Sequence, residues 1–578
     1  MKNITYTVPK NNSEIFVFPA IDCIPDLVRK NKHKIHTYTF EINGIPFMVL
    51  RDKIREELIY KAKHFSERMQ SLFRSETNTS DVFAWNSAHK IVSEENTCGM
   101  QGVNTHTLNY SSLRNIPIVQ TGHEPILYHP GIWIKNHLVQ HIVKKINGIG
   151  INMVVDNDAY NMGFAYIPDL SGKPPSVQKV HLVEGMHRFA YEEISLGSVD
   201  PIQNFGTNVL NLLKRDDSNV IGKKVIADMQ LMFKVFINGI VECYRRGCTN
   251  MAELLTAARM SLEKEFCITN LEIPVSLISD SEGFLQYFLH IVRAADRFAG
   301  IYNRKLGEYR IIHKIRSKAN PLPDIKVIEN TVELPFWIWK KGEQRERCFV
   351  IHDGESMKIT NGSDVFVVLS RDKSVEENIV MLKDVVKSGV KIRPRAITAT
   401  MFSRLFFSEV FVHGIGGAKY DTITDEIIRE FFRVEPPAFI TISATFFLPF
   451  HIDNSADDSL RLLQHEIRDM VHNPENYASE GIRNDSEFKK KLAGKKEILN
   501  IIRKCGKEQK RECFYKIKEL NDLLLKHLRP DYQEKQEKLT LLEGYRIYAE
   551  TARFREYPTF IYPMKLLREC FLHVFSGE

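Results

Sequence analysis

Long apolar runs, internal repeats and closely spaced cysteines are all missing from this sequence of 578 residues. The most apolar window, Ala438 to Phe450, is interrupted by polar residues and is shorter than the roughly 20 residues that a membrane span needs. The nine cysteines include no CxxC pair, so we expect neither a disulfide framework nor a structural zinc site. The N-terminus carries no apolar signal segment, and we therefore predict a cytoplasmic protein that binds no membrane.

The motifs of covalent hydrolases and metalloproteases are also missing. No GxSxG elbow, HExxH helix or cysteine-protease signature occurs, which disfavours hydrolysis through a covalent enzyme intermediate. The net charge of +7 is small for this length, and the basic residues are not gathered in one stripe, so we expect no nucleic-acid partner. A hydrophobic content of 43% is enough to bury a sizeable core in more than one compact unit.

An α/β fold is predicted from about residue 116 onward. A short apolar run at 116–120 is followed by a turn and by a helical pattern that opens at Pro130 and has apolar residues four positions apart. Gly148 ends the helix, and the apolar run 149–155 follows. This strand, helix and strand have the lengths expected of a parallel crossover.

A second strand and helix are predicted near residue 410. Glu409 to His413 resembles a strand, the glycines of 414–417 indicate a loop, and Thr422 to Asp425 resembles a capping box for the next helix. Between the two units, 334–351 carries a hairpin signal. Helical periodicity dominates about 180–320, which predicts a helical insertion.

The predicted organisation has three parts. Residues 1–455 form the α/β core with the insertion at about 180–320. Residues 456–545 are charged and helical, with a leucine seam near a 3.5-residue period before Pro530. Leu541, Tyr545 and Tyr548 after Pro530 indicate a second helix that returns along the first, which predicts an antiparallel coiled-coil hairpin. Residues 546–578 return to the core, with 555–563 as a strand.

The first candidate site is the turn after the first strand. Thr121 and Gly122 precede His123, and His129 stands directly before the helix. Backbone N–H groups at a helix N-terminus favour an anion, and histidines beside that end can donate hydrogen bonds to phosphate oxygens. The alternative is that both histidines cap or pack the turn.

The second candidate site lies after the next strand, at Asp156 and Asp158. Carboxylates at the carboxyl ends of parallel strands can hold a ribose, an amine or a magnesium ion, although an aspartate there can also cap the following segment. Arg393 and Arg395 flank Pro394 and are suited to bidentate binding of a carboxylate or phosphate. Both arginines can equally pair with acidic residues of the fold.

The third candidate site is the glycine-rich stretch before the later helix. Glycines allow close approach of a ligand, and a lysine there can offset charge on a phosphate or carboxylate. The stretch matches neither the Walker pattern nor GxGxxG. Its candidate residues are His413, Gly414, Gly416, Gly417, Lys419, Tyr420 and Asp421.

At these residues the sequence resembles the cysteine-adding enzymes of bacillithiol biosynthesis, a family of cysteine ligases. Thr121 to Pro125 matches the TGQQP-type turn of the family, with His123 and Glu124 at the two glutamine positions, and Asp156 to Asp158 falls at its acidic cluster. Gly414 to Tyr420 replaces the family's glycine-rich loop, with Lys419 in place of an acidic residue. The order of parts agrees over most of the chain, but close motif matches span only a few dozen residues.

The resemblance implies a Rossmann-like, nucleotidyltransferase-like core and a homodimer formed through the helical hairpin. It also implies an ATP-dependent ligase, with Mg²⁺ as a further option, that joins a carboxylate such as an amino acid to an amine. His123 and His129 would stabilise phosphates, Asp156 or Asp158 would hold the ribose, amine or magnesium, and Lys419 would neutralise charge. Two alternatives remain: a nucleotidyltransferase acting on a small phosphorylated metabolite, and a non-catalytic dimeric binding protein.

Overall fold

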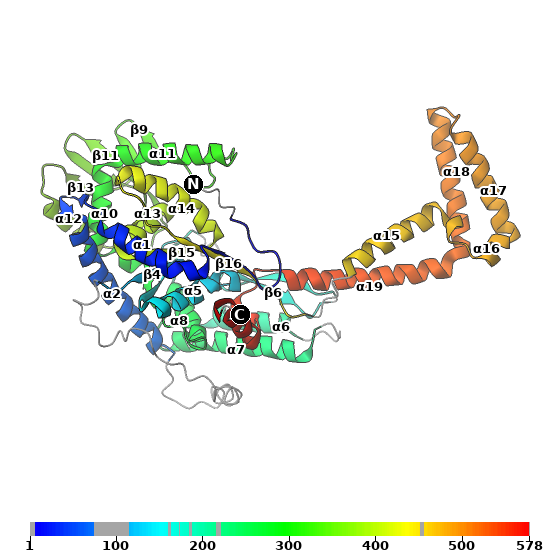
Figure 1. The fold of residues 1–578 in the computed structure, drawn as a ribbon, viewed down its shortest axis with the longest axis horizontal. Coiled ribbons are helices and arrows are strands. Elements are labelled where there is room, and N and C mark those ends of the chain that lie inside the picture. The colour runs from blue at the N-terminus through cyan, green and yellow to red at the C-terminus, as the bar shows by residue number, and fades with distance from the viewer. Residues whose placement is uncertain are drawn as a thin grey trace.

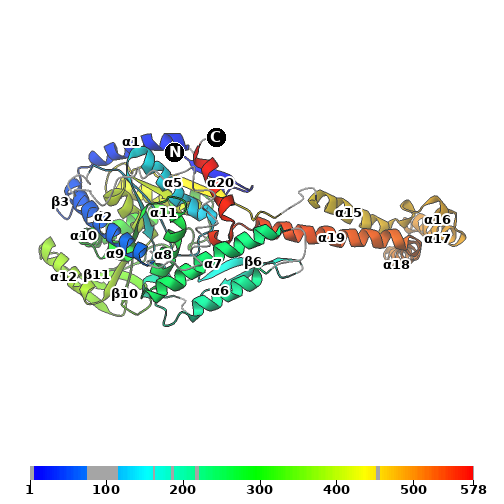
Figure 2. The ribbon, with the colours of Figure 1, turned by 90° about the horizontal axis from the view of Figure 1, so that it is seen from below.

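The computed structural model describes residues 6–73, 115–159, 163–172, 174–183, 188–214, 221–450 and 456–576. It consists of a body that contains two main β-sheets and an arm of helices that projects from it (Figures 1 and 2). No helix in these ranges is both long enough and apolar enough to cross a membrane.

A six-stranded sheet forms the centre of the body. Its order is β1 (Glu14–Phe18), β16 (Ile440–Thr445), β15 (Val410–His413), β4 (Ile118–His123), β5 (Ile149–Val154) and β8 (Leu271–Pro274). Only the β1–β16 pair is antiparallel. The sheet is therefore mostly parallel, and the predicted strands at 116–120, 149–155 and 409–413 are confirmed.

Helices cover both faces of this sheet. On one face α5 (Pro130–Ile146) packs with α7 (Lys223–Arg245) and α8 (Met251–Lys264) in an apolar core that includes Val119. On the other face α2 (Phe47–Ser71) and α14 (Ile415–Phe431) belong to a core that includes Ile118. Because side chains alternate along a strand, one short apolar strand supplies both cores.

The chain leaves the neighbouring strands β4 and β15 in opposite directions. From β4 it passes through α5 to β5, and from β15 it passes through α14 to β16, so the two connecting helices lie on opposite faces. Val412 lies opposite Thr121 in the parallel pairing of β15 and β4. In open α/β sheets, ligands bind beyond the carboxyl ends of the strands at such a reversal.

A second, antiparallel sheet packs beside the first. Its order is β13 (Val365–Ser370), β12 (Ser356–Thr360), β11 (Glu346–Asp353), β10 (Thr331–Lys340) and β14 (Val390–Pro394), with β9 (Val327–Ile328) also paired to β10. The predicted hairpin at 334–351 is confirmed as β10 and β11. Because β14 ends at Pro394, this sheet brings Arg393 to the central one.

The arm contains two antiparallel helix pairs. The first pair is α15 (Ala456–His472) with α19 (Arg529–Arg553), and the second is α17 (Ser486–Ile502) with α18 (Lys507–Leu525) (Figure 1). A small separate core forms where the pairs meet, from Met470, Ala478, Phe488, Leu524 and Leu528. The predicted hairpin is helical as expected, but its pairing is wrong. The chain runs from α18 through a 3-10 turn into α19 without reversing on itself.

The remaining elements connect these parts. The helices are α1 (Ile24–His36), α6 (Asp200–Leu212), α9 (Val275–Ser279), α10 (Glu282–Arg293), α11 (Ala295–Ile312), α12 (Val375–Lys387), α13 (Ala396–Phe402), α16 (Glu480–Asn484) and α20 (Met564–Ser576). Two small ribbons are formed by β2 (Glu41–Ile42) with β3 (Ile45–Pro46) and by β6 (Phe164–Asp169) with β7 (Ser176–His181).

Two local predictions are wrong, and a third is incomplete. The glycine stretch is not a loop, because α14 begins at Ile415 and includes Gly416 and Gly417, so Thr422 lies inside the helix and caps nothing. Residues 555–563 form no strand. Their aromatic side chains are buried around a 3-10 turn, Thr559–Ile561, in the core beside α7. The helical region 180–320 also supplies a strand of the central sheet, β8.

Candidate active site at the carboxyl edge of the parallel sheet

The turn between β4 and α5 holds the first predicted residues. Thr121 is buried, and its hydroxyl donates to the carbonyl of Val412 at 2.8 Å, which ties β4 to β15. The ring of His129 caps α5, because its Nδ1 accepts from the N–H of Gly131 at 3.1 Å. Burial lowers the pKa of His129 to about 3, so the ring is neutral at physiological pH. His129 thus has the capping role that the sequence left open.

A buried lysine contacts this turn. Lys135 of α5 is 4% exposed, and its ammonium donates to the carbonyl of Gly122 at 2.8 Å. Burial, followed by repulsion from Arg259, lowers the pKa of Lys135 to about 7. Burial and then Lys135 hold the pKa of His123 well below its usual value. Sequence reasoning overlooked Lys135 because nothing in the apolar pattern of α5 marks a lysine that points at a strand end.

The carboxyl end of β5 meets the same turn through a pair of acids. Burial, and then the neighbouring Asp158, raise the pKa of Glu124 to about 8. Asp158 also forms an ion pair with Arg345, whose guanidinium lies 2.6 Å from it. Arg345 comes from the β10–β11 hairpin and stacks over Trp337. Two carboxyl groups and one arginine from three segments therefore meet beside His123.

A cavity of about 250 Å³ opens at the carboxyl ends of β5 and β8. Asp156 and Arg393, both predicted as site residues, line it together with residues that sequence reasoning did not single out. The lining comprises Phe65, Arg68, Val154, Asp156, Glu192, Asn250, Ala252, Glu253, Pro274, Ser276, Leu277, Asp280, Lys391 and Arg393.

Asp156 is held by the start of α9, the helix that directly follows β8. Its carboxylate accepts hydrogen bonds from the backbone N–H of Ser276 at 3.0 Å and from the hydroxyl of Ser276 at 2.5 Å. The residue is 3% exposed. Burial, and then the nearby Glu192, raise the pKa of Asp156 to about 7. Near neutral pH this carboxyl group can both accept and release a proton.

The two predicted arginines both bind acidic residues of the protein. The guanidinium of Arg393 contacts both oxygens of Glu192, at 2.7 and 2.8 Å, and Asp280 at 2.7 Å. Burial opposes the charge of Arg393, but Glu192 and Asp280 outweigh it and raise the pKa. Arg395 pairs with Glu333 at 2.8 Å and lies over the ring of Trp337.

The N-terminus of α14 opens beside β4. Its N-cap residue, Gly414, offers no side chain to the first N–H groups of the helix. The ring of His413 fills the space above Gly417, where a Cβ atom would lie 2.7 Å from Nδ1. Gly416 has no neighbour at that position. An uncapped helix N-terminus next to the β4 turn is suited to an anion.

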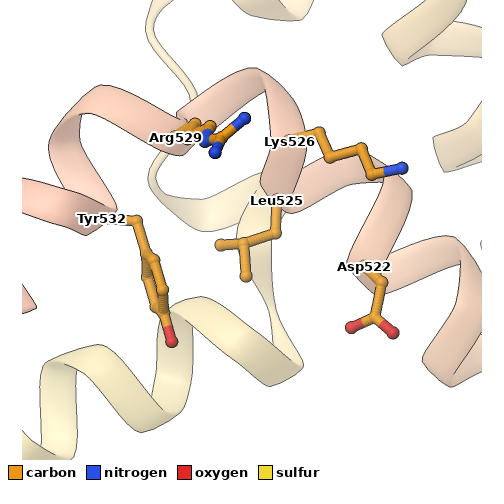
Figure 3. Close-up of a pocket in the computed structure, with 5 residues that line it drawn as sticks. All are labelled: Asp522, Leu525, Lys526, Arg529 and Tyr532. Carbon is orange, nitrogen blue, oxygen red and sulfur yellow. The ribbon is translucent and has the colours of Figure 1, made fainter.

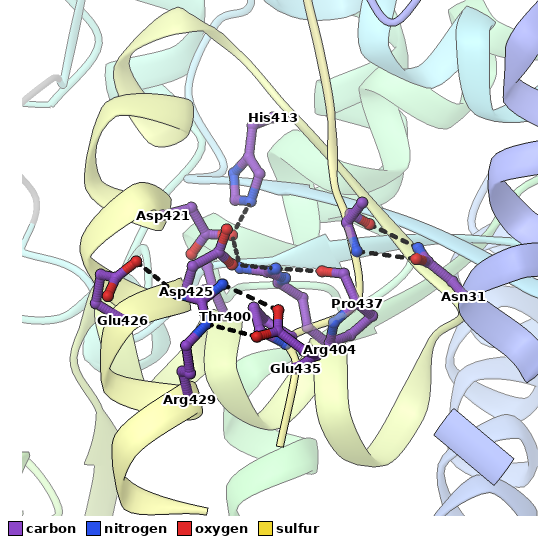
Figure 4. Close-up of polar contacts among 12 residues, drawn as sticks. Asn31, Thr400, Arg404, His413, Asp421, Asp425, Glu426, Arg429, Glu435 and Pro437 are labelled. Carbon is purple, nitrogen blue, oxygen red and sulfur yellow. Dashed lines mark hydrogen bonds and ion pairs between the residues drawn. The ribbon is translucent and has the colours of Figure 1, made fainter. Parts of the chain in front are cut away.

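His413 is fixed by a buried network (Figure 4). Its Nε2 lies 2.7 Å from Asp421, which also accepts from Arg404 at 2.7 Å and from the hydroxyl of Thr400 at 2.8 Å. Burial opposes ionisation of Asp421, but Arg404 and His413 hold its pKa well below the usual range. Arg404 further binds Asp425. This network explains why the glycine stretch is helical, because it joins the second turn of α14 to the end of β15.

The structure therefore gathers most of the predicted residues at one edge of the sheet. His123, Asp156 and His413 stand at or just beyond the ends of the adjacent strands β4, β5 and β15. Asp158 and Arg393 reach the same edge through the contacts described above. Lys419 is exposed on the second turn of α14, and Tyr420 is half-buried beside it.

In the described ranges, no group of three or more histidine, cysteine or acidic side chains is arranged to hold a metal ion. A more open cavity of about 480 Å³ lies on the arm where α18 meets α19 (Figure 3). Its lining consists of Asp522, Leu525, Lys526, Arg529 and Tyr532. It is remote from the sheet edge and holds none of the predicted site residues.

Neither family models nor curated proteins give a match to this chain.

Proposed function

We propose that this chain is an ATP-dependent ligase with a Rossmann-like, nucleotidyltransferase-like core, which joins a carboxylate to an amine. The observation that carries the proposal is the reversal of chain direction between β4 and β15. It puts the His123 turn next to the uncapped N-terminus of α14, at the place where open α/β sheets bind nucleotides.

The phosphates would lie between the His123 turn and the N-terminus of α14. The backbone N–H groups at the start of α14, from Ile415 onward, offer donors without a competing side-chain cap. His123 and the ammonium of Lys135 add donors at the end of β4, and Lys419 adds an exposed positive charge. Gly414, where the position of a Cβ atom is empty, permits close approach of the nucleotide to the backbone, whereas a Cβ atom at Gly122 would meet Met153 at 3.0 Å.

The acids beyond β5 would hold the rest of the nucleotide. Asp158, which is 38% exposed at its side chain, can accept from a ribose hydroxyl. Glu124 and Asp158 together provide the one or two carboxylates with which proteins commonly hold Mg²⁺ on nucleotide phosphates. A bound Mg²⁺ would compensate the charge of this acid pair and of the phosphates.

The acid substrate in this proposal is an amino acid, cysteine being one option, and the protein acts as a homodimer through its arm. Several large apolar side chains of the arm are exposed, which supports a contact between two copies. They are Leu462, Phe514, Tyr515 and Leu541, exposed by 72%, 58%, 57% and 58%.

A thermal-shift screen of the full chain, with nucleotides crossed against amino acids, tests the proposal. Because a ligand that binds only the folded state raises its stability, ATP with Mg²⁺ should raise the Tm, and pyrophosphate release should depend on an amino acid. Pyrophosphate release that depends on a phosphorylated metabolite would favour the nucleotidyltransferase instead.

The matched variants are Lys419→Met and Lys489→Met. Both lysines are exposed on helices, but Lys489 belongs to the arm. We expect Lys419→Met to reduce the ATP-dependent shift and Lys489→Met to leave it unchanged. The absence of a shift with every nucleotide would refute the ligase and the transferase together.

A further inference from the structure

The cavity beyond β5 and β8 contains more acidic than basic side chains. The acidic ones are Asp156, Glu192, Glu253 and Asp280, and the basic ones are Arg68, Lys391 and Arg393. With four carboxyl groups against three cationic groups, the lining carries one uncompensated acid when all are ionised. The position of that acid follows from the ion pairs.

Each basic group already binds a carboxylate other than Asp156. Arg68 pairs with Glu253 at 2.5 Å, and Lys391 lies 4.0 Å from Glu192. Arg393 binds both Glu192 and Asp280 at 2.7 Å. In the part of the chain that the structure describes, no lysine, arginine or histidine forms an ion pair with Asp156.

Asp156 is thus a buried carboxyl group whose direct contacts are hydrogen-bond donors. Arg393 attracts it only from beyond ion-pair distance and is already bound to Glu192 and Asp280. Both donors belong to Ser276, and neither carries a charge. A buried carboxylate is costly without a cation, and a guest ammonium group would supply one. The cavity also has apolar walls, formed by Phe65, Val154 and Leu277.

We propose that this cavity binds a small metabolite that carries a protonated primary amine, with Asp156 as its ion-pair partner. The volume of about 250 Å³ lies below the roughly 300–1,000 Å³ of sites for drug-sized ligands, so the cavity suits a molecule of amino-acid size and not a whole nucleotide. The assignment of this molecule as the amine-bearing substrate rests on the proposed ligase function. The binding of an amine in the cavity does not depend on that function.

Calorimetric titration of the full chain at pH 8, without nucleotide, tests the proposal. The probes are glycine, L-alanine and ethanolamine, each compared with the compound in which a hydroxyl replaces the amine: glycolate, L-lactate and ethylene glycol. We expect at least one amine to bind, at least tenfold more tightly than its hydroxyl counterpart. Equal affinities within every pair, or no binding of any amine, would overturn the proposal.

Variants locate the site. Asp156→Asn keeps the size of the side chain and should weaken amine binding at least tenfold. The control Asp296→Asn, at an exposed position of α11, should not change amine binding. Ala252→Leu places a larger side chain into the cavity while leaving Asp156 intact, and it should also abolish binding. Unchanged amine binding in a folded Asp156→Asn or Ala252→Leu protein would refute the site.

The amine titration and the nucleotide experiment can fail independently of each other. Amine binding without any response to nucleotides would leave the cavity assigned and refute the ligase. A nucleotide response without amine binding would support the ligase and refute the amine site in the cavity.

Discussion

Two aspartates at the same sheet edge, Asp421 and Asp156, are almost equally buried and yet behave in opposite ways. On the β15 side, Arg404 and His413 compensate Asp421, and its pKa lies well below the usual range despite burial. On the β5 side no cation pairs with Asp156 in the described ranges, and burial raises its pKa to about 7. The two pKa values therefore differ because of the charged partners of the aspartates, and not because of how deeply they are buried.

This contrast separates structural from ligand-binding charge. The Asp421 network is complete within the protein and fixes the start of α14 against β15. Asp156 has no ion-pair partner in the described ranges, and it borders a cavity. A buried charge whose partner is missing from the fold is therefore the better indicator of a ligand.

The largest effect is expected where the complete network is broken. Arg404→Ala leaves the buried Asp421 and the half-buried Asp425 without their cation, and it should lower the free energy of unfolding by about 3–5 kcal/mol. Urea unfolding followed by tryptophan fluorescence measures this loss. The control is Arg304→Ala, which breaks a solvent-exposed pair with Glu430 and should leave the free energy of unfolding nearly unchanged. Equal losses would show that the network does not stabilise the fold.

The same substitution at the two aspartates should have effects of opposite sign. Folding raises the pKa of Asp156, so its ionisation lowers stability as the pH rises from about 4 through about 7. Asp156→Asn removes that cost and should stabilise the ligand-free protein by about 1–3 kcal/mol at pH 8 but not at pH 4. Asp421→Asn should destabilise it by about 2–4 kcal/mol at pH 8, because the pKa of Asp421 is lowered on folding.

Urea unfolding of both variants at pH 4 and pH 8 provides the comparison. Two losses of similar size at pH 8 would remove the distinction between the aspartates.

The smallest effect is expected at Asp158, which lies between the two regions and is partly exposed. Asp158→Asn loses the ion pair with Arg345 but keeps a hydrogen-bond acceptor for Glu124, whose raised pKa of about 8 leaves that carboxyl group mostly protonated at pH 7. Because Asp158 is partly exposed, the free energy of unfolding at pH 7 should change by less than about 1 kcal/mol. A loss above 3 kcal/mol in the urea titration would place Asp158 in a structural network like that of Asp421.

Elements with local signals could be predicted from the sequence. The strand ending near His123 and the helix from Pro130 have apolar periodicity and a clear start, and Asn147, with a φ of 50°, ends the helix one residue before the predicted Gly148. The start of α14 could not be predicted, because Gly416 and Gly417 favour a loop unless Asp421 is held by Arg404, which precedes it by 17 positions.

Only the site residues that have a local sequence signal could be predicted. Asp156 follows a strand and is visible as a strand-end carboxylate. Ser276, Glu192 and Asp280 come from distant segments and meet it only through the fold. Residues 555–563 show the opposite failure. Their apolar pattern resembles a strand, but packing of Tyr557, Phe560 and Tyr562 into the core determines their conformation.

The decisive measurement is a crystal structure of the full chain grown with a non-hydrolysable ATP analogue and the amine that binds most tightly in the calorimetric titration. We expect phosphates between the His123 turn and the N-terminus of α14, and an ammonium group within hydrogen-bond distance of Asp156. Ligands bound away from this edge, or a cavity without the amine when the nucleotide is present, would contradict both assignments.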